Sequence, residues 1–178
     1  VIASFAWTGH GVANQGIPGA VHLAGDLGHL LAAGVWIGAL VPLGVMVLRA
    51  HAPAEAHAVQ FGLDRFSQIG MPVVAVLVLS GLINSWYLIG PAHWRALTET
   101  GYGVTLLVKL GLFATMLVLA ALNRYRWSPE LRAALQSHRP AHDVQRALRA
   151  TVIMETAVAM LVLLAVSLLG TLVPPISI

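Results

Sequence analysis

Four long apolar segments constrain this chain more than any other feature of its sequence. They cover residues 22–48, 66–89, 103–123 and 151–173. A helix needs about 20 mostly apolar residues to cross the hydrocarbon core of a bilayer, and each segment reaches that length. We expect helices rather than strands, because an open strand leaves backbone hydrogen-bonding groups unsatisfied in lipid. The sequence therefore predicts an all-α integral membrane protein, a bundle of four transmembrane helices.

The composition excludes an ordinary soluble domain, which would be about 25% charged. Hydrophobic residues make up 58% of the chain and charged residues 10%, and we treat residues 1–178 as one transmembrane domain. Because the chain has no cysteine, any bound metal must be held by histidine, methionine or carboxylate side chains. The apolar stretch Val1–Trp7 is too short to span and does not begin with methionine. We expect it to be the end of a preceding transmembrane helix in a longer chain.

Arginine side chains lie almost entirely on one side of the predicted bundle. The loops over residues 49–65 and 124–149 carry eight arginines, whereas the loop over residues 90–102 carries one. Since cytoplasmic loops are enriched in lysine and arginine, the two arginine-rich loops are predicted to be cytoplasmic. The N-terminal segment, the 90–102 loop and the C-terminal tail then face the outer, periplasmic side. We expect the arginines to contact anionic lipid headgroups, and we expect no nucleic-acid binding.

A polar stripe marks the outer end of the first segment. His22, Asp26 and His29 fall within a narrow arc at about 100° per residue, and Trp36 continues this face more deeply. His22 and His29 stand about 10 Å apart along a helix axis, so they share one ion only if the start of the helix is distorted, which Gly25 and Gly28 permit. A third ligand from another segment would help. His10, in the sequence WTGHG, lies on the same side, and its glycine neighbours let the backbone fold back. These residues predict a metal or proton site of His10, His22 and His29.

The alternative assigns the same side chains to packing, with His22 at the membrane interface and His29 hydrogen-bonded to a neighbouring helix. That is the commoner role of a single histidine, but ionisable residues inside a membrane are functional candidates by default. Lys109 lies at a depth comparable with Asp26, and a buried lysine needs an anionic partner, so we expect the two to pair. The other interpretation is that the Lys109 ammonium group reaches outward to the interface.

Three more side chains inside the spans are candidates for a transport path. Glu155 lies in the inner part of the fourth segment, where Asn123, Ser67 or an arginine is its expected partner. Met116 and Met160 lie near the middle of the bilayer, and thioethers are soft ligands for Cu(I). For the methionines a packing role is favoured, because methionines fill gaps between helices. For the glutamate a structural pair explains its position at least as well as a transport path.

Five segments, read in order along nearly the whole chain, resemble those of one membrane-protein family. They are WTGHG, HLAGDLGHLLAAGVWIGALVPL, RFSQIGMPVVAVLVLSGLINSWYLIG, TGYGVTLLVKLGLFATMLVLAALNR and VIMETAVAMLVLLAVSLLGTLVPP. The family is the CopD/PcoD copper resistance protein D family. The resemblance implies a multi-pass protein of the bacterial inner membrane that handles copper by import. His10, His22 and His29 match the family's histidines, so the resemblance implies that they capture copper on the periplasmic side.

The same resemblance implies partners for this domain. A periplasmic copper-binding protein of the CopC type is expected beside it, and further transmembrane helices are expected ahead of it in the chain. Within the site, we expect Asp26 to orient an imidazole ring and Lys109 to hold Asp26 in place.

Two other functions fit parts of the pattern. A membrane b-type cytochrome needs haem-ligating histidines that face each other from different elements, but the histidines inside the spans share one helix. A sensor or assembly subunit would bind metal without transporting it. The sequence carries no nucleotide fingerprint or phosphate-binding loop, and we expect no enzymatic activity.

Overall fold

A computed structural model of the chain describes residues 17–50, 53–89, 95–137 and 139–173. The helices follow one another as α2 (Ile17–Arg49), α3 (Pro53–Leu88), α4 (Ala96–Glu99), α5 (Gly101–Leu122), η3 (Asn123–Trp127), α6 (Ser128–Gln136) and α7 (His142–Leu169). The segment η3 is a π-helical turn that joins α5 to α6 without a break. The stretch Val1–Trp7 and His10, which the sequence analysis singled out, lie outside the described residues.

Four helices of the described chain are long and apolar enough to cross a membrane. They cover Gly19–Arg49, Glu55–Tyr87, Gly101–Gln136 and His142–Leu169. The predicted all-α bundle of four transmembrane helices is therefore confirmed. Many large apolar side chains on these helices are exposed, such as Leu79, Leu82 and Val118. An outward apolar surface of this kind is what a helix that faces lipid requires.

The helices extend well beyond the predicted spans at the arginine-rich end. The predicted loop over residues 49–65 is mostly the beginning of α3, and the predicted loop over residues 124–149 contains η3, α6 and the start of α7. At about 1.5 Å per residue, the 36 residues of α3 reach about 54 Å, whereas the hydrocarbon core is about 30 Å thick. Hydropathy marks only the part of a helix that lies in lipid, so these polar turns were assigned to loops.

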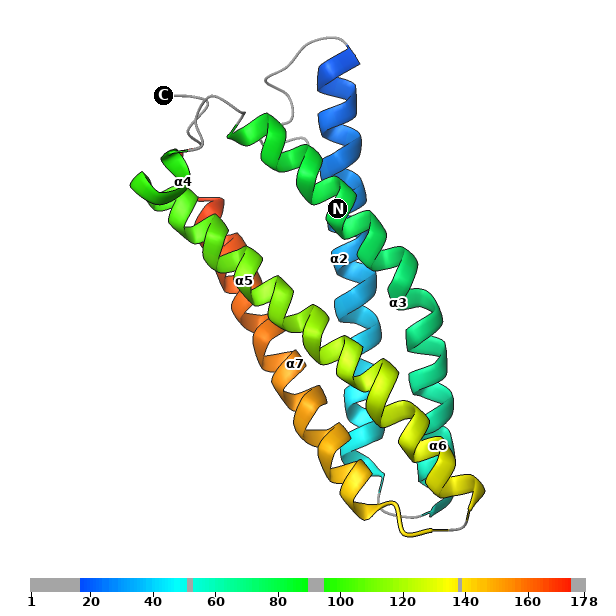
Figure 1. The fold of residues 1–178 in the computed structure, drawn as a ribbon. Coiled ribbons are helices and arrows are strands. Elements are labelled where there is room, and N and C mark those ends of the chain that lie inside the picture. The colour runs from blue at the N-terminus through cyan, green and yellow to red at the C-terminus, as the bar shows by residue number, and fades with distance from the viewer. Residues whose placement is uncertain (1–16, 51–52, 90–94, 138, 174–178) are drawn as a thin grey trace.

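The bundle consists of two helix pairs, α2 with α3 and α5 with α7. The pairs lie together at the end where α6 is found and diverge toward the opposite end (Figure 1). One apolar core cluster, which includes Leu63, Leu131 and Leu148, fills the α6 end. A second cluster around Trp36 and Met116 fills the middle. The close packing of both clusters holds the two pairs together over the inner part of the bundle.

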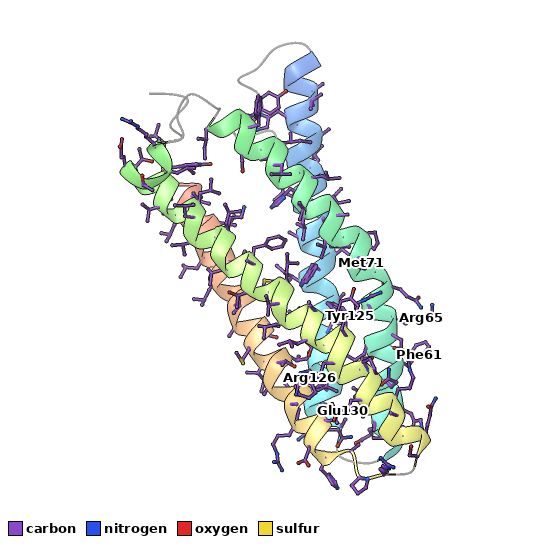
Figure 2. All side chains as sticks on the ribbon, viewed as in Figure 1. Phe61, Arg65, Met71, Tyr125, Arg126 and Glu130 are labelled. Atoms are coloured by element: carbon purple, nitrogen blue, oxygen red, sulfur yellow. The ribbon has the colours of Figure 1, made fainter. Side chains whose placement is uncertain are left out.

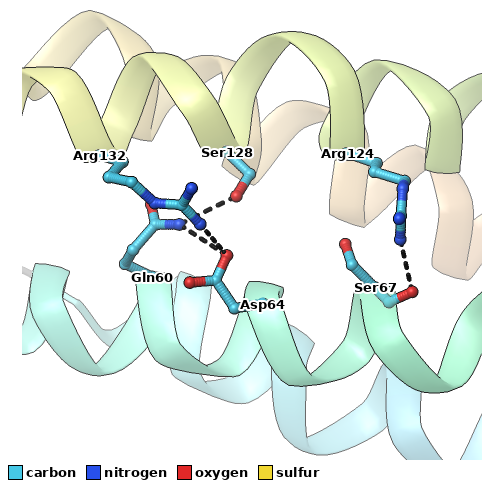
Figure 3. A network of polar contacts seen from close by, with 6 residues as sticks. All are labelled: Gln60, Asp64, Ser67, Arg124, Ser128 and Arg132. Atoms are coloured by element: carbon cyan, nitrogen blue, oxygen red, sulfur yellow. Dashed lines mark hydrogen bonds and ion pairs between the residues drawn. The ribbon is translucent and has the colours of Figure 1, made fainter.

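Polar side chains tie α6 and η3 to α3 at the arginine-rich end (Figure 3). Gln60 donates hydrogen bonds of 3.0 Å to both Asp64 and Ser128, and Arg132 forms a 2.6 Å ion pair with Asp64. Arg124 donates to the backbone carbonyl of Ser67 at 2.5 Å. These contacts fix the position of η3, and therefore of the residues that η3 turns toward the core.

Arginine and aromatic side chains cover the outside of the same end. Phe61, Arg65, Tyr125 and Arg126 are all exposed there (Figure 2). The Arg65 guanidinium lies 5.2 Å from the centre of the Phe61 ring, which is a cation–π distance. Amphipathic groups of this kind suit the boundary between lipid and water.

Candidate metal-binding site

His22 is the most deeply buried polar residue of the first transmembrane helix, with 2% of its surface exposed. Its ring stacks on Tyr87 of α3, with ring centres 4.7 Å apart and an angle of 13° between the planes. The Nε2 atom lies 3.8 Å from an Asp26 carboxylate oxygen, which is too long for a hydrogen bond. Both ring nitrogens are buried without a hydrogen-bond partner. A buried imidazole in this state keeps a lone pair for a metal or a proton.

Close packing of α2 against α3 holds this histidine in position. A Cβ atom on Gly25 would lie 3.0 Å from the Asn84 side-chain oxygen and 3.0 Å from an Ile83 methyl carbon. A larger residue would therefore require the Asn84 and Ile83 side chains to shift, so Gly25 favours the close approach of the two helices one turn from His22. The Asn84 oxygen is also buried without a partner.

His29 bonds to α3 through one ring nitrogen. Its Nδ1 atom lies 3.0 Å from the Ser80 hydroxyl oxygen, and the hydroxyl donates to the Val76 carbonyl at 2.5 Å. Because the serine proton is used in that bond, Nδ1 acts as the donor to Ser80, and a neutral ring then carries its lone pair on Nε2. A hydrogen bond that fixes one nitrogen in this way prepares the other nitrogen for a ligand.

Lys109 brings a third transmembrane helix, α5, to the same region. It interacts electrostatically with Asp26 and with His29, and Tyr102, at the outer end of α5, interacts with Asp26 as well. The Asp26 carboxylate thus lies among Lys109, Tyr102 and His22. Its negative charge offsets the lysine, which would otherwise oppose a bound cation.

These residues do not complete a metal site by themselves. Within the described ranges, no group of three or more histidine, aspartate or glutamate side chains is arranged to hold a metal ion. His22 and His29 are two helical turns apart, about 10 Å along the axis. His10, the third predicted ligand, lies outside the described residues.

The transport-path candidates fall into two groups. Met116 is 5% exposed and Glu155 is 1% exposed, so both lie inside the bundle. Met160 is 62% exposed on the outer surface of α7. The Glu155 carboxylate accepts a 3.2 Å hydrogen bond from Asn123, one of its three expected partners.

The α3 side of the histidine cluster was not predicted from the sequence. Neither Tyr87 nor Ser80 was singled out as a site residue. A polar side chain within an uncharged apolar span is the signal that could have found Ser80. No signal of this kind distinguishes Tyr87, because tyrosine is common where a helix leaves the membrane.

An apolar helical bundle of this kind defines a multi-pass membrane protein, and histidines, a carboxylate and a lysine within its spans are a candidate site for an ion or a proton. Residues 62–169 match the family "Copper resistance protein D". A protein named copper resistance protein D, from Pseudomonas syringae pv. tomato, is 38% identical over 176 residues, 97% of this chain and 56% of that protein. The chain belongs to the copper resistance protein D family.

Two further relatives are similar over shorter or weaker matches. The copper transport protein CutJ of Bacillus subtilis (strain 168) is 32% identical over 66% of this chain and 21% of that protein. The inner membrane protein YebZ of Escherichia coli (strain K12) is 31% identical over 95% of this chain and 55% of that protein. The chain spans about half the length of the first and third relatives and about a fifth of the second. No solved structure matches it.

Proposed function

We propose that this chain is the part of an inner-membrane copper importer that captures the ion on the periplasmic side. Membership of the copper resistance protein D family and a relative named copper transport protein support copper handling. Four apolar helices and a relative named inner membrane protein support the location. The main support for the proposed metal site is the buried His22 ring, whose two nitrogens have no hydrogen-bond partner.

In this proposal His22 and His29 each supply one imidazole nitrogen and His10 closes over them from the N-terminal segment. The Ser80 hydrogen bond supports the role of His29, because it leaves Nε2 as the ligating atom. Asp26 orients His22 and balances charge, and Lys109 holds Asp26. Imidazole suits copper in either oxidation state, and a fourth position is left for water or for a CopC-like donor protein.

The transported ion would then pass along the interior of the bundle toward the arginine-rich end. Met116 supports such a path, because its thioether is buried in the central cluster below the histidines. Glu155 lies further inward and is also buried. Met160 takes part only if another helix of a longer chain or a second subunit covers the exposed face of α7.

Copper-binding isotherms on single variants test the site. His10→Ala, His22→Ala and His29→Ala should each remove most of the bound copper from the purified protein. His57→Ala and His142→Ala are the matched controls, because both side chains are exposed near the opposite end and should leave binding unchanged. Binding should also weaken in acid, since protons and metal compete for the same lone pairs.

Unchanged copper binding in His22→Ala and His29→Ala would contradict the proposed site and return both residues to a packing role. Copper uptake into proteoliposomes tests transport separately from binding. A protein that binds copper in the isotherm but gives no uptake would be a sensor or assembly subunit. A haem absorption spectrum in the purified protein would favour the cytochrome instead.

A further inference from the structure

A second buried polar group lies in the inner half of the bundle, away from the histidines. The buried face of α7 is apolar at five of its six positions, and Glu155 is the sixth; the face consists of Val144, Leu148, Val152, Glu155, Ala159 and Ala165. The glutamate side chain is 1% exposed. Isolated charges are costly in such surroundings, so a carboxyl group there needs either a proton or strong hydrogen-bond donors.

One donor to this carboxyl group comes from the π-helical turn. Asn123, the first residue of η3, donates from Nδ2 to Glu155 Oε2 at 3.2 Å. The Asn123 oxygen in turn accepts a 2.5 Å hydrogen bond from the Thr151 hydroxyl on α7. Thr151 thereby directs the amide N–H group of Asn123 toward the glutamate. A π-helical turn inside a helix is uncommon and frequently marks a functional position.

A second N–H donor lies near this carboxyl group. The Trp36 side chain on α2 interacts with Glu155 across the bundle. Trp36 Nε1 and Glu155 Oε1 are both buried, and neither has another hydrogen-bond partner. The carboxyl group therefore has Asn123 as a hydrogen-bonded donor and the Trp36 N–H group as a nearby one.

The charged groups on the surrounding elements are directed elsewhere. Arg124 of η3 bonds to the Ser67 carbonyl, and Arg149 of α7 bonds to the carbonyls of Val47 and Ala50. Lys109 of α5 lies 14 residues from Asn123, about 21 Å along the helix axis. Arg49 of α2 lies 13 residues from Trp36, about 20 Å along the helix axis, and Asp64 of α3 pairs with Arg132. Within the part of the chain that the structure describes, neutral N–H donors therefore act on Glu155.

We propose that Glu155 is a proton-exchange site served from the arginine-rich end of the bundle. Burial favours the protonated carboxyl group. When the O–H bond breaks and the proton passes to water at that end, the N–H groups of Asn123 and Trp36 stabilise the carboxylate that remains. Arg149 lies six residues from Glu155, about 9 Å along the axis, so the path to that end is short. The site does not depend on copper.

Infrared spectroscopy of the whole protein in lipid nanodiscs, without metal, tests this site. The carbonyl stretch of a protonated carboxyl group should be present near pH 6, where exposed carboxyl groups are already ionised, and should disappear as the pH is raised to about 9. The band should be missing in Glu155→Gln, which has the shape of the neutral form. It should persist in Glu130→Gln, since Glu130 is an exposed carboxylate on α6.

A second pair of variants tests the role of the Trp36 N–H group. Trp36→Phe removes the N–H group and should move the titration of the band to higher pH, because the ionised form loses a donor. Trp86→Phe changes an exposed indole on α3 and should not move it. A titrating band that survives in Glu155→Gln, or a wild-type protein with no such band, would overturn the proposal. If Glu155→Gln does not fold, equal titrations in Trp36→Phe and Trp86→Phe would overturn it.

Discussion

At the scale of single residues, the outer end of α5 depends on one glycine. Thr100 caps this helix by accepting from the Gly103 N–H at 3.1 Å, and its hydroxyl donates to the Ala96 carbonyl at 2.6 Å. A Cβ atom on Gly103 would overlap the Ala96 carbonyl and the Leu97 backbone. The short helix α4 therefore folds back onto α5 only because residue 103 has no side chain.

Gly103→Ala should accordingly destabilise the folded protein. Forcing a methyl group into a filled space typically costs about 1–3 kcal/mol. Gly111→Ala on the same helix is the control, because nothing lies within 4 Å of the added atom, and alanine is the better helix former. Thermal unfolding of both variants in detergent should show a lower midpoint for Gly103→Ala only. Equal midpoints would mean that α4 moves aside without cost.

The sequence predicts much of the histidine cluster, but only its part on one helix. Spacing alone puts His22, Asp26 and His29 on one face of α2, because helical periodicity is a local property. The contacts of His22 with Tyr87 and of His29 with Ser80 depend on how far α3 is rotated and shifted against α2. That arrangement results from packing along both helices, so no local pattern encodes it.

At the scale of secondary-structure elements, apolar packing rather than ion pairing should hold α6 to the bundle. Leu131 on α6 is fully buried in the inner core cluster. The neighbouring Arg132–Asp64 pair has side chains that are 51% and 36% exposed, and exposed pairs contribute at most about 1 kcal/mol. The two adjacent residues therefore offer a direct comparison of the two kinds of contact.

Leu131→Ala should lower the free energy of unfolding by about 2–5 kcal/mol, the usual loss for a buried leucine. Arg132→Ala should lower it by less than about 1 kcal/mol. Denaturant unfolding followed by circular dichroism would measure both. A larger loss for Arg132→Ala would show that the network with Gln60 and Asp64 is the main attachment of α6.

The sequence predicts the positions of the transmembrane spans but not the full lengths of the helices. Hydropathy located all four spans, because lipid contact demands apolar residues. It did not predict the polar first turns of α3, which begins at Pro53, a residue suited to a helix start. Hydropathy also did not predict the π-helical turn at Asn123. One extra residue within a five-residue segment does not change the pattern of apolar and polar residues enough to be detected.

At the scale of the whole molecule, the distribution of arginines predicts how the bundle is oriented across the membrane. The starts of α2 and α5 lie at one end, and the end of α2, the start of α3, α6 and the start of α7 lie at the other (Figure 1). Eight of the nine arginines belong to the stretches 49–65 and 124–149, at the α6 end. Since arginine-rich ends stay in the cytoplasm, we expect the histidine cluster to face the periplasm and Glu155 to lie nearer the cytoplasm.

Cysteine labelling in intact cells tests this direction, and the absence of native cysteine makes single labels unambiguous. Thr98→Cys, on the exposed surface of α4, should react with a membrane-impermeant maleimide added from outside. Ser137→Cys, exposed just after α6, should react only once the cells are opened. Both positions are exposed, so a difference in labelling reports the side of the membrane rather than burial. Outside labelling at Ser137→Cys but not at Thr98→Cys would invert the bundle and put the histidines on the cytoplasmic side, where they could not capture periplasmic copper.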